Sequence, residues 1–216
     1  MILVRLAVLQ WKNLLGQSKM KELYIYGASG HGLVVADIAK DNGYDNIIFI
    51  DDGENEYPTF EDIKNSNNIP IAFAIGNNNI RAKLYEKVKK EGYQVATLIH
   101  SSSIISSSVC IEEGAVVMPS VVVNANSTIG KAVILNSSSV IEHECIIEDF
   151  VHISPNVSLA GNVKIKELTH IGISSCVIQG LTVGKNSLIG AGSVVVKNIK
   201  DNIKAYGNPC CEVEEL

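Results

Sequence analysis

The sequence predicts a small parallel α/β sheet followed by a parallel β-helix of hexapeptide repeats, and three observations support this fold class. Short apolar runs alternate with helical patterns up to residue 99. From Ile99 to Val195 every sixth residue is Ile, Leu or Val, a period that no helix or ordinary strand has. Gly and Asn recur at a fixed place in these hexads, where tight corners require a positive φ.

Residues 20–99 carry the strand–helix alternation. A buried strand at 23–26 is followed by a Gly-rich turn and by a helical pattern at 33–39. Further strands are expected at 47–50, 71–75 and 94–99, and a charged amphipathic helix at 80–90. This order implies a parallel sheet covered by helices, about half of a doubly wound, Rossmann-like nucleotide-binding domain.

Residues 100–216 are predicted to form the β-helix domain. The aliphatic side chain of each hexad points inward, and a small or branched residue four positions later fills the remaining space. Three hexads make one triangular coil, so residues 18 apart stack at the roughly 4.8 Å spacing of neighbouring strands. The hexads run without a long insertion from Ile105 to Lys200. The inward small residues are Ala115, Ser127, Ser139, Cys145, Val157, Ser175, Ser187 and Ser193, and the Gly and Asn corner residues are Gly114, Asn126, Asn156, Asn162, Gly180, Asn186, Gly192 and Asn198.

Residues 1–19 differ in pattern from the rest of the chain. This stretch is apolar but is interrupted by Arg5, Trp11 and Lys12, and it lacks the basic start and cleavage site of a signal peptide. Met20 is therefore a candidate start, with an upstream extension of no function. The alternative is a short amphipathic helix that packs on the body or contacts a membrane surface.

Composition and charge exclude several classes of protein. The formal net charge of the 216 residues is −5, so no basic surplus exists for a nucleic-acid backbone. No apolar run reaches the roughly 18 residues of a membrane span, so stable membrane insertion is not expected. Five cysteines without a CxxC pair indicate neither a disulfide framework nor a structural zinc site. A cytoplasmic location is the expectation.

A candidate anion site lies in the turn at residues 27–32. Its glycines let a ligand approach the backbone, and the N-terminus of the following helix attracts negative charge. The turn does not have the GxGxxG pattern of dinucleotide-binding proteins. Asp51 and Asp52 end the next strand, where an acidic residue often meets a ribose hydroxyl.

His143 is a candidate general base because glutamates flank it. A neutral imidazole with one nitrogen held by a carboxylate is suited to proton abstraction. The spacing alone does not decide between Glu142 and Glu144 as the partner. Gly161 lies 18 residues further, directly one coil along, and its N–H is a candidate oxyanion donor. Cys145 occupies a small inward position and is expected in the core.

His152 and His170 are also 18 residues apart and should stack in adjacent coils. His143 is half a coil away from His152, so the two cannot easily share a site within one chain. They can meet if prisms from different subunits pack side by side.

Four segments identify a family resemblance: YIYGASGHG at 24–32, IDD at 50–52, AIGNN at 74–78 and NSSSVIEHEC at 136–145. With the unbroken hexads, they resemble the bacterial hexapeptide-repeat sugar acetyltransferases that make diacetamido sugars of the bacillosamine type. The similarity runs from about residue 21 to about residue 209. The related sialic acid O-acetyltransferases share these features and are the alternative.

The resemblance implies a left-handed β-helix, a homotrimer with active sites between subunits, and no metal. It also implies transfer of acetyl from acetyl-coenzyme A to the amine of a UDP-4-amino-4,6-dideoxy sugar for glycan biosynthesis. His143 would be the base, Glu144 its orienting acid and Gly161 the oxyanion donor. The positions matched to the sugar nucleotide are Ser29, Gly30, His31, Asp51, Asp52, Gly76 and Asn136, and those matched to acetyl-coenzyme A are His152, Ile173 and Ala191. His170 has no assigned role.

Two further classes explain the residues less well. Hexapeptide β-helices include zinc carbonic anhydrases, which need about three converging histidines. The glutamates around His143 and the first domain argue against that class. A non-catalytic scaffold that binds a nucleotide sugar would explain the fold but not His143 with Glu144 and Gly161.

Overall fold

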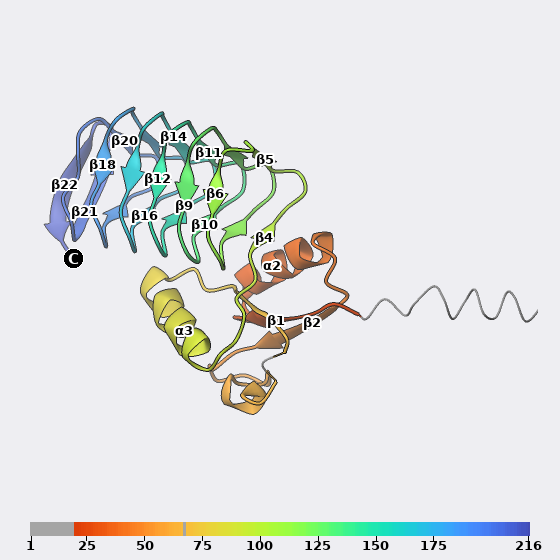
Figure 1. Ribbon diagram of the computed structural model, residues 1–216. Coiled ribbons are helices and arrows are strands. Elements are labelled where there is room, and N and C mark those ends of the chain that lie inside the picture. Colours follow the sequence, from red (N-terminus) through yellow and green to blue (C-terminus); the bar gives the residue numbers. More distant parts are fainter. Residues whose placement is uncertain (1–19, 67) are drawn as a thin grey trace, which may run out of the picture.

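The computed structural model describes residues 20–66 and 68–216 and contains two parts in contact (Figure 1). The first is a small sheet with helices α2 and α3, and the second is a triangular coil of short strands. The predicted extension at residues 1–19 lies outside the described residues.

The first part is a parallel sheet of order β2-β1-β3. Its elements are β1 (Glu22–Tyr26), α2 (Gly30–Asp41), β2 (Asn46–Ile50), the 3₁₀ turn η1 (Glu61–Ile63), β3 (Ile71–Phe73) and α3 (Asn78–Lys90). The strand predicted at 94–99 is divided between the two parts. Val95 makes a single bridge to Ile71, and then β4 (Leu98–Ile99) pairs with the coil because it forms the first rung of that stack.

The second part is a prism of three sheets, in which each strand pairs in parallel with the strand 18 residues away. Sheet I holds β4, β7 (Val116–Val117), β10 (Ile134–Leu135), β13 (His152–Ile153), β16 (His170–Ile171), β19 (Leu188–Ile189), β21 (Ile203–Gly207) and the antiparallel β22 (Cys210–Glu215). Sheet II holds β5 (Ile104–Ile105), β8 (Val122–Val123), β11 (Val140–Ile141), β14 (Ser158–Leu159), β17 (Cys176–Val177) and β20 (Val194–Val195). Sheet III holds β6 (Cys110–Ile111), β9 (Thr128–Ile129), β12 (Ile146–Ile147), β15 (Lys164–Ile165) and β18 (Thr182–Val183). The predicted fold class, a small α/β sheet before a left-handed β-helix, is confirmed.

The interior of the prism has the predicted phase. From Val117 to Val195 the every-sixth aliphatic residues are buried, whereas Ile99, Ile105 and Ile111 at the first coil are only partly buried. All eight predicted small inward residues are buried as well. Burial of each aliphatic side chain contributes about 1.5–3 kcal/mol, so the repeat itself supplies the core.

The corners of the prism explain the Gly and Asn pattern. Every sixth residue from Gly114 to Gly192 has a positive φ, including Glu144 with a φ of 59°. The prediction for Asn198 is wrong, because the last coil is shorter than the others. Ile189 pairs with Ala205, two residues sooner than the regular repeat, and Asn202 takes the positive φ instead.

Sheet I is the face that the first part covers. Val116, Met118 and Ile134 point outward from this sheet and are buried in one cluster with β1 and α2. Sheet II lies on the side of the coil away from α2 and α3 (Figure 1). The first part covers only the first coils of sheet I. The outward histidines of β13 and β16 therefore lie at the boundary of the two parts.

Leu159→Asp should prevent folding, because its side chain is 1% exposed and an unpaired buried charge is strongly unfavourable. The control is Thr182→Asp, whose side chain points outward from β18 in sheet III, next to Lys164 of the preceding coil. Circular dichroism with a thermal melt should show a folded, wild-type-like control and an unfolded or insoluble Leu159→Asp chain. A stable Leu159→Asp protein would contradict the phase assignment.

Candidate active site

The corner between sheets II and III brings His143, Glu144 and Gly161 together. The His143 Nδ1 lies 3.0 Å from Glu144 Oε2, and both side chains are more than half exposed. A carboxylate only accepts, so this contact places the proton on Nδ1 and leaves the Nε2 lone pair free. The imidazole lies over Gly161, where an added Cβ would be 2.6 Å from Nε2. Only glycine leaves room for this ring position.

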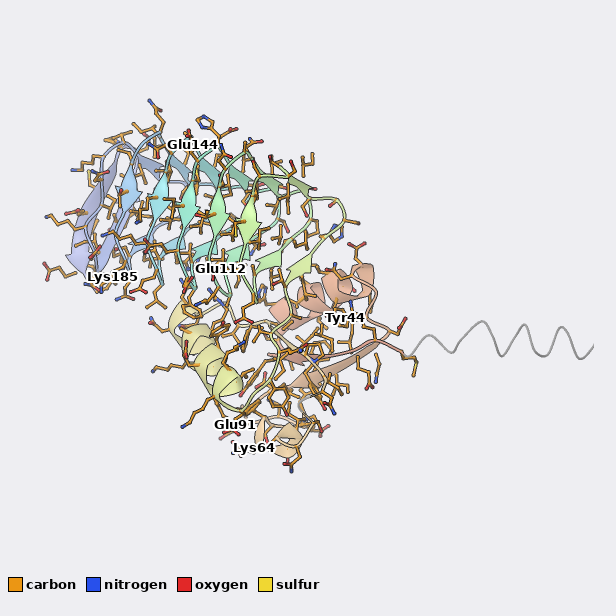
Figure 2. The ribbon with its side chains drawn as sticks, viewed as in Figure 1. Tyr44, Lys64, Glu91, Glu112, Glu144 and Lys185 are labelled. Atoms are coloured by element: carbon orange, nitrogen blue, oxygen red, sulfur yellow. The ribbon has the colours of Figure 1, made fainter. Side chains whose placement is uncertain are left out.

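The corner geometry decides between the two flanking glutamates. Glu144 has the positive φ of a corner residue, which turns its side chain toward the His143 ring. Glu142 instead accepts a hydrogen bond from the Asn124 side-chain amide at 2.9 Å. Glu144 is therefore the carboxylate that the fold presents to His143. Figure 2 shows Glu144 on the edge of the coil far from α2 and α3.

A second cluster forms where sheet I meets the first part. The His152 Nδ1 lies 3.3 Å from the Gly76 carbonyl oxygen, and its Nε2 lies 3.3 Å from Asn136 Nδ2. The ring stacks on His170, with centroids 4.5 Å apart and planes 7° apart. The predicted stack of histidines is confirmed, and the fold brings together Gly76, Asn136 and His152, which are distant in sequence.

The histidines of this cluster are neutral. Burial, then the neighbouring His170 and Arg81, lower the pKa of His152 to about 3. Burial and Arg81 also lower the pKa of His170 and of His31. The His31 Nε2 is buried without a hydrogen-bond partner among the described residues. The 27–32 turn therefore carries an unpartnered ring nitrogen that is buried within the protein.

Arg81 and Asn78 belong to this cluster, and sequence reasoning missed both. Arg81 is 1% exposed, although it lies in a helix whose charged residues suggested a solvated surface. Its guanidinium donates to carbonyls of the coil and of the loop after β3. The Asn78 amide donates to the carbonyls of Leu168 and Thr169. These partners are far away in sequence, so no local pattern could reveal them.

The turn at residues 27–32 lies between β1 and α2, as predicted. Ser29 is the N-cap residue of α2, makes no side-chain capping bond, and no acidic residue occupies the first turn. Asp51 accepts from the Ala28 N–H at 2.9 Å, which holds the turn in place and lowers the pKa of Asp51. Asp52 accepts from Tyr26, Phe60 and Lys87. Both carboxylates thus have hydrogen-bond partners within the protein. The sequence had suggested instead that they contact a ligand such as a ribose hydroxyl.

Ile173 and Ala191 lie on a different edge, between sheets I and II. Ile173 is 47% exposed, and its carbonyl accepts from the Gly192 N–H of the next coil. The His143 edge and this edge border sheet II on opposite sides. One chain therefore does not bring His143 to His152, Ile173 or Ala191.

Comparisons with known proteins find relatives of this chain in sequence and in fold. A family model described as the PglD N-terminal domain matches residues 22–88. The acetyltransferase domain of PglB from Neisseria gonorrhoeae is 36% identical, with a TM-score of 0.84 over 89% of this chain and 100% of that domain. PerB from Caulobacter crescentus, solved with CoA and GDP-perosamine, is 31% identical, with a TM-score of 0.85 over 89% of this chain and 97% of PerB.

The chain belongs to the acetyl-coenzyme A-dependent sugar N-acetyltransferases of the hexapeptide-repeat class.

Curated relatives of this chain are matched over less of their length. GDP-perosamine N-acetyltransferase of Escherichia coli O157:H7 is 28% identical over 65% of this chain and 66% of that enzyme. An acyl-carrier-protein–UDP-N-acetylglucosamine O-acyltransferase of Aliivibrio fischeri is 32% identical over 56% of this chain and 45% of that enzyme. The chain thus spans less than two thirds of the length of these two relatives.

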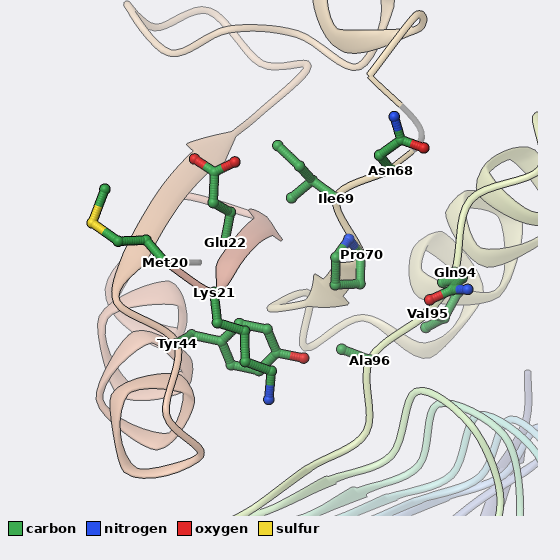
Figure 3. Close-up of a pocket in the computed structure, with 10 residues that line it drawn as sticks. All are labelled: Met20, Lys21, Glu22, Tyr44, Asn68, Ile69, Pro70, Gln94, Val95 and Ala96. Carbon is green, nitrogen blue, oxygen red and sulfur yellow. The ribbon is translucent and has the colours of Figure 1, made fainter. Parts of the chain in front are cut away.

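A cavity of about 380 Å³ lies apart from both clusters (Figure 3). Its lining includes Lys21, Glu22, Tyr44 and Pro70, at the amino ends of β1 and β3. Parallel sheets bind ligands at the carboxyl ends of their strands, where the 27–32 turn lies. No predicted site residue lines this cavity, so we do not assign it to the reaction.

Neither a metal site nor a membrane-spanning helix is found in the described part of the chain. Within 20–66 and 68–216 no group of three or more His, Cys, Asp or Glu side chains could hold a metal ion. In the same part of the chain, none of the helices combines the length and apolar character that a membrane crossing requires.

Gly161→Ala should lower kcat on the order of 10²-fold, because the new Cβ must displace the His143 ring from its position. Gln179→Ala, one coil further along the same edge, is the matched control and should leave kcat unchanged. Steady-state kinetics measure kcat of both variants, and thermal melts show whether both are folded. A Gly161→Ala enzyme with wild-type kcat would show that the ring position over Gly161 is not used.

Proposed function

We propose that the chain transfers acetyl from acetyl-coenzyme A to the amine of a UDP-linked 4-amino-4,6-dideoxy sugar in glycan biosynthesis. The observation that carries the chemistry is the His143–Glu144 pair at 3.0 Å, with the free Nε2 over a residue without a side chain. This arrangement is an exposed imidazole with one nitrogen held by a carboxylate and the other free. The UDP-linked sugar rests on the resemblance of the 24–32 and 136–145 segments.

His143 is the general base of this proposal. Its Nε2 takes a proton from the amine as the amine nitrogen forms a bond to the thioester carbonyl carbon. Glu144 accepts the Nδ1–H and stabilises the imidazolium that forms. When the carbon–sulfur bond breaks, the imidazolium returns the proton to the leaving thiolate of coenzyme A, so His143 is regenerated.

Gly161 supplies the oxyanion contact. Its N–H makes no hydrogen bond within the described residues, and it lies beside the His143 ring. A free backbone donor there stabilises the negative charge of a tetrahedral intermediate. Cys145 is not a nucleophile in this scheme, because it is fully buried and burial raises the pKa of its thiol.

The 20–99 domain holds the nucleotide in this proposal. Ser29, Gly30 and the first turn of α2 offer uncapped donors and the positive end of the helix dipole to the diphosphate. His31 lies in the same first turn of α2 and is assigned to the same nucleotide. Asp51 acts by holding the Ala28 backbone, and Asp52 by holding Phe60 and Tyr26. Gly76 and Asn136, which both contact His152, are assigned to the same substrate.

A homotrimer completes the site. The outward positions of sheet II carry no charge; they are Ile104, Val122, Val140, Ser158, Cys176 and Val194. If three copies pack around this apolar sheet, the His143 edge of one copy meets the edge of the next copy that bears Ile173 and Ala191. His152, Ile173 and Ala191 then contact acetyl-coenzyme A opposite the base. The cytoplasmic location stays a prediction.

His143→Ala should lower kcat by about 10²–10⁴-fold, the usual effect of removing a general base, while both substrates still bind. Glu144→Gln should cost less, because it leaves the imidazole in place. The rise of kcat with pH should disappear in His143→Ala. Near-normal kcat in this variant would refute the mechanism, and reversal of chelator inhibition by zinc would favour a metal enzyme instead.

His143→Ala and His152→Ala chains, each impaired on its own, should recover activity when they are mixed, unfolded and reassembled, because some interfaces then combine two intact edges. The control is each variant reassembled alone, which should stay impaired. Light scattering should report a trimer in every sample. A fully active monomer would contradict the shared site.

The substrate is tested with a panel of acceptors and acetyl-coenzyme A, read by thiol release. Turnover of a UDP-4-amino sugar, with a GDP-4-amino sugar and free sialic acid unused, supports the proposal. Turnover of the GDP-linked sugar alone would place the enzyme with PerB in its substrate. Turnover of sialic acid alone would identify an O-acetyltransferase.

A further inference from the structure

Arg81 is a buried cation whose hydrogen-bond acceptors among the described residues are backbone carbonyls and the Asn78 side-chain oxygen, and none is a carboxylate. Its Nε lies 2.8 Å from Ala132 O, its Nη1 2.8 Å from Ile75 O, and its Nη2 2.7 Å from Phe150 O. Ala132 and Phe150 are corner residues of neighbouring coils, and Ile75 follows β3. One guanidinium therefore joins two coils to the loop at the carboxyl end of β3.

The same guanidinium holds the carbonyl that fixes the His152 ring. Arg81 Nη1 lies 3.4 Å from Gly76 O, and His152 Nδ1 lies 3.3 Å from the same oxygen. Because a carbonyl oxygen only accepts, His152 carries its proton on Nδ1. Its Nε2 then accepts from the Asn136 amide. The Asn136 carbonyl oxygen accepts from the Ser137 N–H at 2.8 Å, so the orientation of this amide is also fixed.

The charge of Arg81 acts on the same ring. Burial lowers the pKa of Arg81 to about 9, so the guanidinium stays charged at neutral pH. Burial is the largest cause of the low pKa of His152, and His170, Arg81 and His31 oppose its protonation further, while the Gly76 carbonyl favours it. With its parallel neighbour His170 only 4.5 Å away, a second positive charge in this cluster is unfavourable.

We propose that Arg81 is a positioning residue for acetyl transfer: through the Gly76 carbonyl it holds His152, and Asn136 with it, in one neutral tautomer and one orientation. The inference rests on the proposed contact of His152 with acetyl-coenzyme A. It makes the loop after β3, which belongs to the nucleotide domain, part of the acetyl-coenzyme A site.

A double-mutant cycle tests this role. Arg81→Met keeps the length of the side chain and removes the charge and the donors. It should raise the KM for acetyl-coenzyme A about tenfold in the wild-type background and have little further effect in His152→Ala. Lys83→Met, on the exposed face of the same helix, is the matched control. It should leave the KM for acetyl-coenzyme A unchanged in both backgrounds.

The results of this cycle distinguish failure of the Arg81 positioning role from failure of the proposed His152 contact with acetyl-coenzyme A. An Arg81→Met effect that is equal in both backgrounds overturns the positioning role and leaves the His152 contact standing. A His152→Ala enzyme with an unchanged KM for acetyl-coenzyme A overturns the contact itself.

A measurement on the wild-type protein does not depend on the folding of any variant. Nitrogen-15 NMR of the histidine rings should show His152 as the neutral Nδ1–H tautomer throughout pH 5.5–8. A His152 ring that is protonated within this range, or that carries its proton on Nε2, overturns the inference.

Discussion

Stacking of side chains at a fixed interval of 18 residues is the constraint on which this structure depends. Each aliphatic residue contacts its equivalents in the coils before and after it, so the interior is one continuous column of Ile, Leu and Val. The column can close only if the chain turns sharply every sixth residue, and the positive φ values from Gly114 to Gly192 provide those turns. Core and corners thus impose the same register on every coil.

That register also builds the catalytic corner. Because His143 and Gly161 occupy the same place in successive coils, the ring of one lies directly over the backbone of the other. The positive φ that closes the prism at residue 144 also turns the glutamate toward the histidine. A structural rule of the repeat therefore sets the position of a base, its carboxylate and a backbone donor without any dedicated loop.

The second cluster depends on a different kind of constraint. Arg81 and Asn78 satisfy carbonyls at the corners of the coil, and their donors reach residues more than fifty positions away. A buried cation without a counter-charge is tolerated because its donors are shared among several carbonyls. This fixes the nucleotide domain on sheet I, and it gives the cluster a positive, apolar environment in which the imidazoles stay neutral.

The sequence by itself determined the repeat, its phase and the stacking of Gly161 on His143 and of His170 on His152, because a strict period converts residue number directly into position. It also located the Gly-rich turn between a strand and a helix. Only the tertiary structure decided that Glu144 and not Glu142 meets the base, because that depends on a backbone torsion. Tertiary structure alone revealed that Asp51 and Asp52 are engaged by the protein and that Arg81 is buried, because their partners come from segments that no local pattern relates. The shortened last coil at Asn198 escaped prediction for a similar reason: the pairing of Ile189 with Ala205 is set by the closing hairpin and not by the hexads.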